Sequence, residues 1–382
     1  LQSAKTSGQA QVVVHSYDKN RGNLQAARSS TQTTITAGKF EARFDEAGQI
    51  RALRGAPDAR IVSKTDEKDL LERLSTSDVL DVAFDPRNGV SSISQTGHFV
   101  YSEGGRKATA ERATYTPDDG RLVLSGSPRM TDTGIAVVAR SMRIDFSTGD
   151  AAANGQVKTT YSGLKPVPEG ALFASSDPIH VTADDMTAHR SPSKATYEGN
   201  ARLWQGGNVI SAPSIEFDQD RRSVIARASA TKQVSITLVQ SAAANKPELV
   251  AITSKSFSYV DQERKAHLEG PVSVSQKDAK VTAIHMDIFL QGNGLAPAGK
   301  LERIVAEGTI LISQPSRKAS GDRLVYTASD DKFVLTGKSP SIFDANHGNI
   351  TGVSLTLFGR DGRVLVEGSD KSPALTQSRV AR

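Results

Sequence analysis

Residues His180–Phe217 read HVTADDMTAHRSPSKATYEGNARLWQGGNVISAPSIEF, and this stretch holds the pattern that decides the fold. Short runs such as Ser214–Phe217 alternate polar with apolar residues, and Gly, Pro, Asp and Asn separate the runs. An alternation of period two places every second side chain on one face of a β-strand, and the separating residues favour tight turns. Similar runs recur at Arg121–Leu124, Ser141–Phe146, Val272–Val274, Thr309–Ile312, Arg323–Tyr326 and Ser354–Leu357. The sequence therefore predicts an all-β protein, with helical spacing confined to Lys64–Leu74.

A repeated frame links these runs. An aromatic residue is followed eleven residues later by Gly, with an apolar residue two positions before that Gly. We interpret the frame as a strand ending at an inward ring, a turn, a returning strand with its apolar residue inward, and a glycine bend. One such hairpin cannot bury its apolar face alone, so neighbouring hairpins must stack into a repeat architecture. The frame occurs at Phe44/Gly55, Tyr115/Gly126, Tyr259/Gly270 and Tyr326/Gly337, and with other first residues at Ala188/Gly199 and Leu357/Gly368.

Composition excludes several classes of function. The chain has 382 residues, of which 37% are hydrophobic and only 5% aromatic, which is lean for a large enzyme core but too apolar for a disordered chain. It has no cysteine, which excludes disulfides, thiolate catalysis and cysteine-bound metals. The net charge is +5, and the chain has no dense basic run or recognition helix, so a nucleic-acid partner is not expected.

The order of short motifs resembles the LptA/LptC (OstA-like) family of lipopolysaccharide-transport proteins. Within the opening stretch, the resemblance is carried by Glu198–Ala201, by Gln205-Gly206 and by Ile210–Ile215. Ala319–Gly368 carries a second copy and Ala108–Gly155 a third. The resemblance implies an open β-jellyroll, or β-taco, in which two facing sheets leave an apolar slot for lipid acyl chains.

What the resemblance implies about function is a non-enzymatic periplasmic carrier. It would bind lipopolysaccharide and pass it from an inner-membrane ABC transporter toward an outer-membrane translocon, with head-to-tail self-association as a further contact. No cofactor or metal is implied. Because the chain begins with Leu1, we expect a cleaved signal or an inner-membrane anchor before it. The predicted domains are residues 1–161, LptC-like, and 177–382, LptA-like, with one continuous stack as the other arrangement.

Inward alternation within this fold predicts the residues that line the slot. They are mostly aliphatic and of middling size, which suits flexible acyl chains, although the same residues could simply fill a core. The predicted lining residues are Leu124, Val137, Ile144, Phe146, Leu203, Ile210, Ile215, Phe217, Tyr259, Ile312, Leu324, Tyr326, Leu335 and Leu355. Basic turn residues such as Arg221, Arg222 and Arg363 are interpreted as solvated rather than as phosphate ligands.

Two other classes of function compete with the carrier. A structural β-solenoid scaffold or filament would show the same repeats around a filled core. A carbohydrate-active β-solenoid enzyme would need paired carboxylates on one sheet face, and no clear pair is present. The seven scattered histidines have no metal-ligand spacing.

Overall fold

The computed structural model of the chain consists of β-strands, and its described residues form no α-helix. The structure describes residues 2–17, 30–65, 71–85, 89–163, 172–173, 175–191, 193–241, 247–291, 301–345, 348–359, 362–368 and 373–377. By compactness the chain divides into two units, one of Leu1–Tyr161 with Asp184–Pro192 and one of Ser162–Ala183 with Ser193–Arg382. The prediction of an all-β protein of stacked antiparallel strands is confirmed.

The first unit contains strands β1 to β15, and β16 (Ile179–His189) is shared between the two ranges. The strands are β1 (Ser3–Lys5), β2 (Ala10–Tyr17), β3 (Ser30–Ala37), β4 (Lys39–Phe44), β5 (Ile50–Ala56), β6 (Ala59–Thr65), β7 (Arg73–Ser77), β8 (Val79–Asp85), β9 (Gly89–Glu103), β10 (Arg106–Thr116), β11 (Arg121–Ser125), β12 (Arg129–Asp132), β13 (Ile135–Val138), β14 (Ser141–Asp145) and β15 (Ala151–Tyr161).

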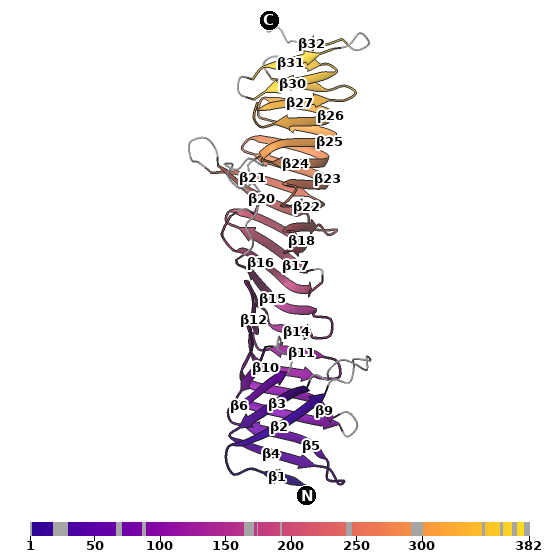
Figure 1. The fold of residues 1–382 in the computed structure, drawn as a ribbon. Coiled ribbons are helices and arrows are strands. Elements are labelled where there is room, and N and C mark those ends of the chain that lie inside the picture. The colour runs from indigo at the N-terminus through magenta and orange to yellow at the C-terminus, as the bar shows by residue number, and fades with distance from the viewer. Residues whose placement is uncertain are drawn as a thin grey trace, which may run out of the picture. The chain divides into compact units, whose positions relative to one another are not determined.

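The second unit contains the remaining strands, and β22 to β27, β30 and β31 follow one another along it (Figure 1). The strands are β17 (Lys194–Gln205), β18 (Asn208–Asp218), β19 (Ser223–Arg227), β20 (Val234–Ser241), β21 (Pro247–Ser254), β22 (Ser256–Val260), β23 (Lys265–Gln276), β24 (Ala279–Leu290), β25 (Leu301–Ser313), β26 (Arg317–Thr327), β27 (Lys332–Thr336), β28 (Ser341–Asp344), β29 (Gly348–Thr351), β30 (Ser354–Phe358), β31 (Val364–Glu367) and β32 (Leu375–Gln377).

The long strands of the second unit take part in two antiparallel ladders at once. The first ladder runs β17–β18–β19–β22–β23–β24–β25–β26–β27–β30–β31. The second runs β17–β18–β20–β21–β23–β24–β25–β26–β28–β29–β32. Each short strand belongs to only one ladder. The unit is therefore a stack of rungs in which every long strand crosses from one sheet to the other.

A shift of strand register marks the corner where each long strand changes sheets. It falls between Glu198 and Ala201 in β17 and between Glu269 and Val272 in β23. Gly270 lies at the second of these corners with φ +87°, and a Cβ there would come within 2.6 Å of the Lys255 side chain. Such a bulge bends a strand and is a common place for glycine. The free ends of the ladders, opposite the corners, form the mouth of the rungs.

The predicted frame glycines behave in two ways. Gly126, Gly199, Gly270 and Gly337 have positive φ, as a glycine bend requires. Gly55 and Gly368 do not have a positive φ. At these two positions the chain therefore does not make the left-handed bend that the frame predicts.

The first unit repeats the arrangement with its own two ladders. One runs β1–β4–β5–β8–β9–β10–β11–β14–β15 and the other β2–β3–β6–β7–β9–β10–β12–β13–β15. The expected helix over Lys64–Leu74 is wrong at both of its ends, because residues 64–65 end β6 and Leu74 lies in β7. Residues 66–70 lie outside the described residues.

Candidate functional site

A row of fully buried apolar side chains runs along the first ladder of the second unit. The residues follow one another by strand register, and none is more than 3% exposed. We call them the deep row, because they lie next to the corners. They are Tyr197, Ile215, Ala226, Phe257, Leu268, Met286, Ala306, Leu324, Leu335 and Leu355. Neighbouring side chains on one face of a sheet cannot bury each other completely. The near-zero exposure of this row therefore means that the opposite sheet covers it.

A second inward row, the mouth row, lies two residues farther along each strand, toward the turns. It comprises Phe217, Val224, Tyr259, Ala266, Ile288, Ile304, Tyr326, Phe333, Leu357 and Val364. Its exposure changes along the stack. The residues from β18 to β24 are buried, at 7% or less, whereas those from β25 to β31 are partly exposed. The mouth is therefore closed at one end of the unit and open at the other.

The second ladder presents an apolar row of its own. Its members are Leu203, Ile210, Ile236, Ile252, Val274, Val281, Ile312, Ala319, Ile342 and Ile350. The residues Leu203 to Ile252 are at most 2% exposed. Val274, Val281 and Ile312 are partly exposed. The second ladder is therefore partly exposed over β23 to β25 and buried again at Ala319 and Ile342, whereas the mouth row becomes accessible only from β25 onward, so the two exposed stretches overlap at β25.

The structure distributes the predicted lining residues over these rows and over the first unit. Ile215, Leu324, Leu335 and Leu355 lie in the deep row; Phe217, Tyr259 and Tyr326 lie in the mouth row; Leu203, Ile210 and Ile312 lie in the second ladder. Leu124, Val137, Ile144 and Phe146 belong to the first unit. The structure therefore brings the ten residues of the second unit onto the inward faces of one stack. Whether any of the set contacts lipid stays a prediction.

Burial restricts which of these residues lipid can reach. Leu203, Ile215, Leu335 and Leu355 are 0% exposed, so a chain contacts them only if the two sheets move apart. Tyr326 and Ile312 are accessible as they stand. Close packing of the deep row is a property of an ordinary protein core. The apolar side chains that are accessible without movement of the sheets are therefore those in the open part of the mouth.

Phe146 is the most exposed member of the predicted set, at 52%. It follows β14 and packs edge-on against Tyr115, with ring centroids 5.9 Å apart. In the second unit Tyr326 and Phe333 make the corresponding aromatic pair at the mouth, with centroids 4.4 Å apart. Both units therefore have an aromatic pair at the ends of their rungs.

A loop segment closes the buried end of the mouth, and sequence reasoning missed it. Leu172 and Phe173 are 5% and 1% exposed. The Leu172 backbone N–H donates to Tyr259 Oη at 2.7 Å, and the Phe173 ring packs edge-on against the Tyr259 ring at 5.9 Å. The stretch Ser162–Ser176 reads as a joint in sequence, and residues 164–171 and 174 lie outside the described residues. The one available signal was an adjacent pair of large apolar residues in an otherwise polar loop.

A buried ion pair lies beside this segment. Arg222 Nη1 is 3.8 Å from Asp261 Oδ2, and the two side chains are 8% and 1% exposed. Arg222 Nε and both Asp261 carboxylate oxygens are buried without a hydrogen bond. Burial raises the pKa of Asp261 to about 6 and lowers the pKa of Arg222. The expectation that Arg222 is solvated is therefore wrong, because its turn folds back against β22 and its neighbours.

A polar link joins the two sheets of the first unit. Gln95, on β9, is 5% exposed. Its Nε2 donates to Ser77 Oγ at 3.2 Å, and its Oε1 accepts from Ser75 Oγ at 2.8 Å. Both serines lie on β7 in the other ladder. Because a buried amide must keep its partners, this link fixes the spacing of the two sheets at that rung.

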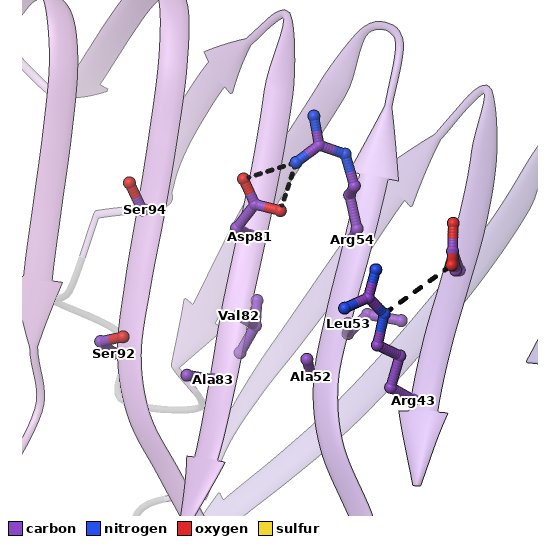
Figure 2. Close-up of a pocket in the computed structure, with 10 residues that line it drawn as sticks. Arg43, Ala52, Leu53, Arg54, Asp81, Val82, Ala83, Ser92 and Ser94 are labelled. Carbon is purple, nitrogen blue, oxygen red and sulfur yellow. Dashed lines mark hydrogen bonds and ion pairs between the residues drawn. The ribbon is translucent and has the colours of Figure 1, made fainter. Parts of the chain in front are cut away.

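A shallow hollow of 290 Å³ lies on the outer face of the first unit (Figure 2). Its floor is made by small side chains such as Ala52, Ala83 and Ser92, and Arg54 forms a bidentate ion pair with Asp81 at 2.8 and 3.1 Å across it. The hollow is open to solvent and is lined by an ion pair, so it does not resemble an acyl-chain site.

Among the described residues, no group of three His, Asp or Glu side chains could hold a metal ion. The same residues form no helix that could span a membrane.

Comparison with known families decides how the open mouth is interpreted. Residues 251–363 match the LptA/(LptD N-terminal domain) LPS transport protein family. The resemblance to LptA-type proteins is confirmed over this span, which contains the open part of the mouth from Ile304 to Leu357.

One solved structure that matches part of the chain is LptH, the LptA homologous periplasmic component of the lipopolysaccharide transport device from Pseudomonas aeruginosa. The match has 16% identity and a TM-score of 0.27, and it covers 33% of this chain and 93% of that one. No curated protein sequence matches the chain.

Proposed function

We propose that the protein is a periplasmic carrier that holds lipopolysaccharide by its acyl chains in the open mouth of the second unit. The single observation that carries the proposal is the partly exposed apolar run from Ile304 to Val364, continuous by strand register and almost wholly within the LPS transport family span. The second ladder supplies the partly exposed Ile312 on β25, the strand that also carries Ile304. The sugar part of the lipid remains in water outside the turns.

The energetic role of such a mouth is to lower the cost of taking lipid out of a membrane. Burying one CH₂ group is worth about 0.8 kcal/mol, so a twelve-carbon chain gains on the order of 10 kcal/mol when fully covered. A row that is itself partly exposed covers an acyl chain only partly, so the free-energy gain per chain is smaller. An acyl chain that slides from one rung to the next equivalent rung keeps nearly the same free-energy gain. The protein therefore needs no chemical reaction of its own to move the lipid.

The partners follow from the same role. Lipid arrives from an inner-membrane ABC transporter, which supplies direction, and leaves toward an outer-membrane translocon. The edge strands β1, β2, β31 and β32 each pair on one side only among the described strands. Such edges accept a partner strand, so they suit docking to other bridge proteins or to a second copy. Attachment to the inner membrane belongs to the same proposal.

A structural scaffold is the second candidate, and the packing of the deep row favours it. Side chains such as Tyr197, Leu268 and Leu335 fill the space near the corners completely. A stalk needs only that filled core. The two candidates differ in what they require of the mouth, because a scaffold has no use for accessible aromatics such as Tyr326 and Phe333.

The experiment compares neighbouring residues of β25 that point to opposite faces. Ile304 lies in the mouth row and Val305 on the outer face. Ile304→Asp places a carboxylate against the acyl chains, so we expect it to reduce the lipopolysaccharide retained on the purified full chain. Val305→Asp is the matched control and leaves retention unchanged. Thermal unfolding verifies that both variants fold. Equal retention by both variants, or none by the natural chain, contradicts the proposal.

A further inference from the structure

Two described pieces of one loop, Leu172–Phe173 and Ser175–Asp177, contact both ladders of the second unit at its mouth, and we call them together the segment. On the first ladder it contacts Tyr259 through the Leu172 N–H and the Phe173 ring. On the second ladder, Gln205 Nε2 donates to the backbone oxygens of Ser175 and Asp177 at 3.0 and 2.7 Å. These contacts tie both sides of the opening to one short piece of chain.

Asn208 adds a further contact on the second ladder. Asn208 Nδ2 donates to the Leu172 carbonyl at 3.3 Å, and Asn208 Oδ1 accepts from the Val239 N–H at 3.0 Å. Asn208 opens β18, at the turn end of the second ladder. The side-chain amides of Gln205 and Asn208 and the Tyr259 hydroxyl thus hold the segment across the mouth, through hydrogen bonds to its backbone.

The position of the segment explains why the mouth is closed at one end. Phe217, Val224 and Tyr259, in the rungs where the segment contacts Tyr259, are at most 1% exposed, whereas the equivalent register positions Ile304 and Tyr326 are partly exposed. The apolar row itself is continuous through both parts. Leu172 and Phe173 therefore lie against the mouth row at the place where, in the open rungs, an acyl chain would lie.

The closed end is not satisfied like an ordinary core. Arg222 Nε is buried beside Asp261 without a hydrogen bond. The Asp261 carboxyl lies near the Tyr259 hydroxyl and the Phe173 backbone, which favour its charged form, but burial outweighs them and raises its pKa to about 6. Water reaching the two charged groups would reduce this cost of burial, which opposes closure. The closed state is therefore a balance between apolar burial of two side chains and the burial of a charged pair at the same place.

We propose that Leu172–Phe173 is an internal substitute for an acyl chain, which bound lipid displaces to extend its site from the open rungs into β18–β22. This inference rests on the proposed function, since it names where the lipid goes beyond the open mouth. The segment competes with lipid, so the closed end fills only when the open rungs are occupied. Its displacement uncovers Tyr259, and lipid reaches that rung from the open rungs past Ala266 and Ile288, which are 6% and 7% exposed.

The test uses thiol accessibility in a chain that contains no natural cysteine. The full-length Phe173→Cys variant is treated with a maleimide, alone and with purified lipopolysaccharide in non-ionic detergent, against detergent only. We expect slow labelling without lipid and a rise of roughly tenfold or more with it. The buried control is Ile236→Cys, at a second-ladder position that is 1% exposed. The exposed control is Leu249→Cys, at a position that is 61% exposed. Ile236→Cys stays protected throughout.

Three results overturn the inference. The first is a Phe173→Cys thiol that labels as fast as Leu249→Cys before lipid is added, which means that the segment does not close the mouth. The second is a thiol that stays protected while a photoreactive residue at position 326 crosslinks to lipid; this leaves the carrier intact and makes the segment permanent core. The third is Ile236→Cys labelling in parallel, which indicates general opening. Lipid that binds nowhere overturns the carrier itself.

A second variant measures the competition directly. Phe173→Ala removes the ring that packs on Tyr259, whereas Phe173→Leu keeps an apolar filler. With a photoreactive residue at position 224, we expect lipid crosslinking to increase in Phe173→Ala and to stay near the natural level in Phe173→Leu. An unchanged yield in a folded Phe173→Ala protein contradicts the inference.

Discussion

Replacing Asp261 by Asn makes the second unit more stable at neutral pH, although it removes one half of an ion pair. Burial raises the pKa of the Asp261 carboxyl to about 6, against an ordinary value of 3.8. Between these two pH values the folded protein keeps a proton that the unfolded chain has released. Stability from this group is therefore present at low pH and is lost as pH rises through the folded pKa.

The magnitude follows from the size of the pKa shift. About 2 pH units at 1.36 kcal/mol each give a loss of about 3 kcal/mol between pH 4 and pH 7. Asn carries no charge at either pH, so Asp261→Asn avoids the loss. The Arg222 guanidinium attracts the carboxylate and Tyr259 lies beside it, and both effects are contained in the shifted pKa.

Trp204 provides the assay, because it is the single tryptophan of the chain and lies in the second unit, stacked on His180. Urea unfolding of both proteins, followed by its fluorescence at pH 4 and pH 7, gives a difference in unfolding free energy at each pH. Groups such as His267 and Asp287 titrate in both proteins and cancel. We expect no difference at pH 4 and a more stable variant at pH 7. A difference that is constant with pH, or that favours the natural protein at pH 7, refutes the reasoning.

Three further substitutions test the packing of the two units. Leu335→Ala, at a deep-row position that is 0% exposed, should lower the free energy of unfolding by about 2–5 kcal/mol, measured by urea unfolding through Trp204. Gly270→Ala should cost more than about 1 kcal/mol, since φ is +87° and a Cβ meets Lys255; a smaller loss in the same assay contradicts the role of the corner. Gln95→Ala leaves Ser75 and Ser77 without their buried partner, so we expect a loss of about 1–3 kcal/mol in the first unit, visible by calorimetry and absent from the Trp204 signal.

Alternation and turn chemistry were enough to predict the rungs. The frame places Tyr259 at a strand end, a turn after it and Leu268 on the returning strand, and the structure has β22, a turn and β23 there. These are local features, so they follow from residues close together in sequence. The positive φ of Gly270 follows for the same reason.

Local sequence patterns could not predict whether the space between the two sheets is filled or open. Alternation says that Leu335 points inward, but not whether the opposite sheet lies close enough to bury it. The closing segment is less predictable still, because Leu172 and Tyr259 are 87 residues apart in the chain. Arg222 was misjudged for the same reason: its partner Asp261 belongs to another turn, which only the stacking of rungs brings near.

The most direct test of the carrier is site-specific photocrosslinking within one strand. A photoreactive residue replaces either Tyr326, which is in the mouth row, or Val325, whose side chain points to the outer face of β26. In cells that produce lipopolysaccharide and the partner proteins, we predict a lipid adduct from position 326 and none from position 325. Equal adducts from both positions, or none from position 326 while the partners are present, would contradict the account.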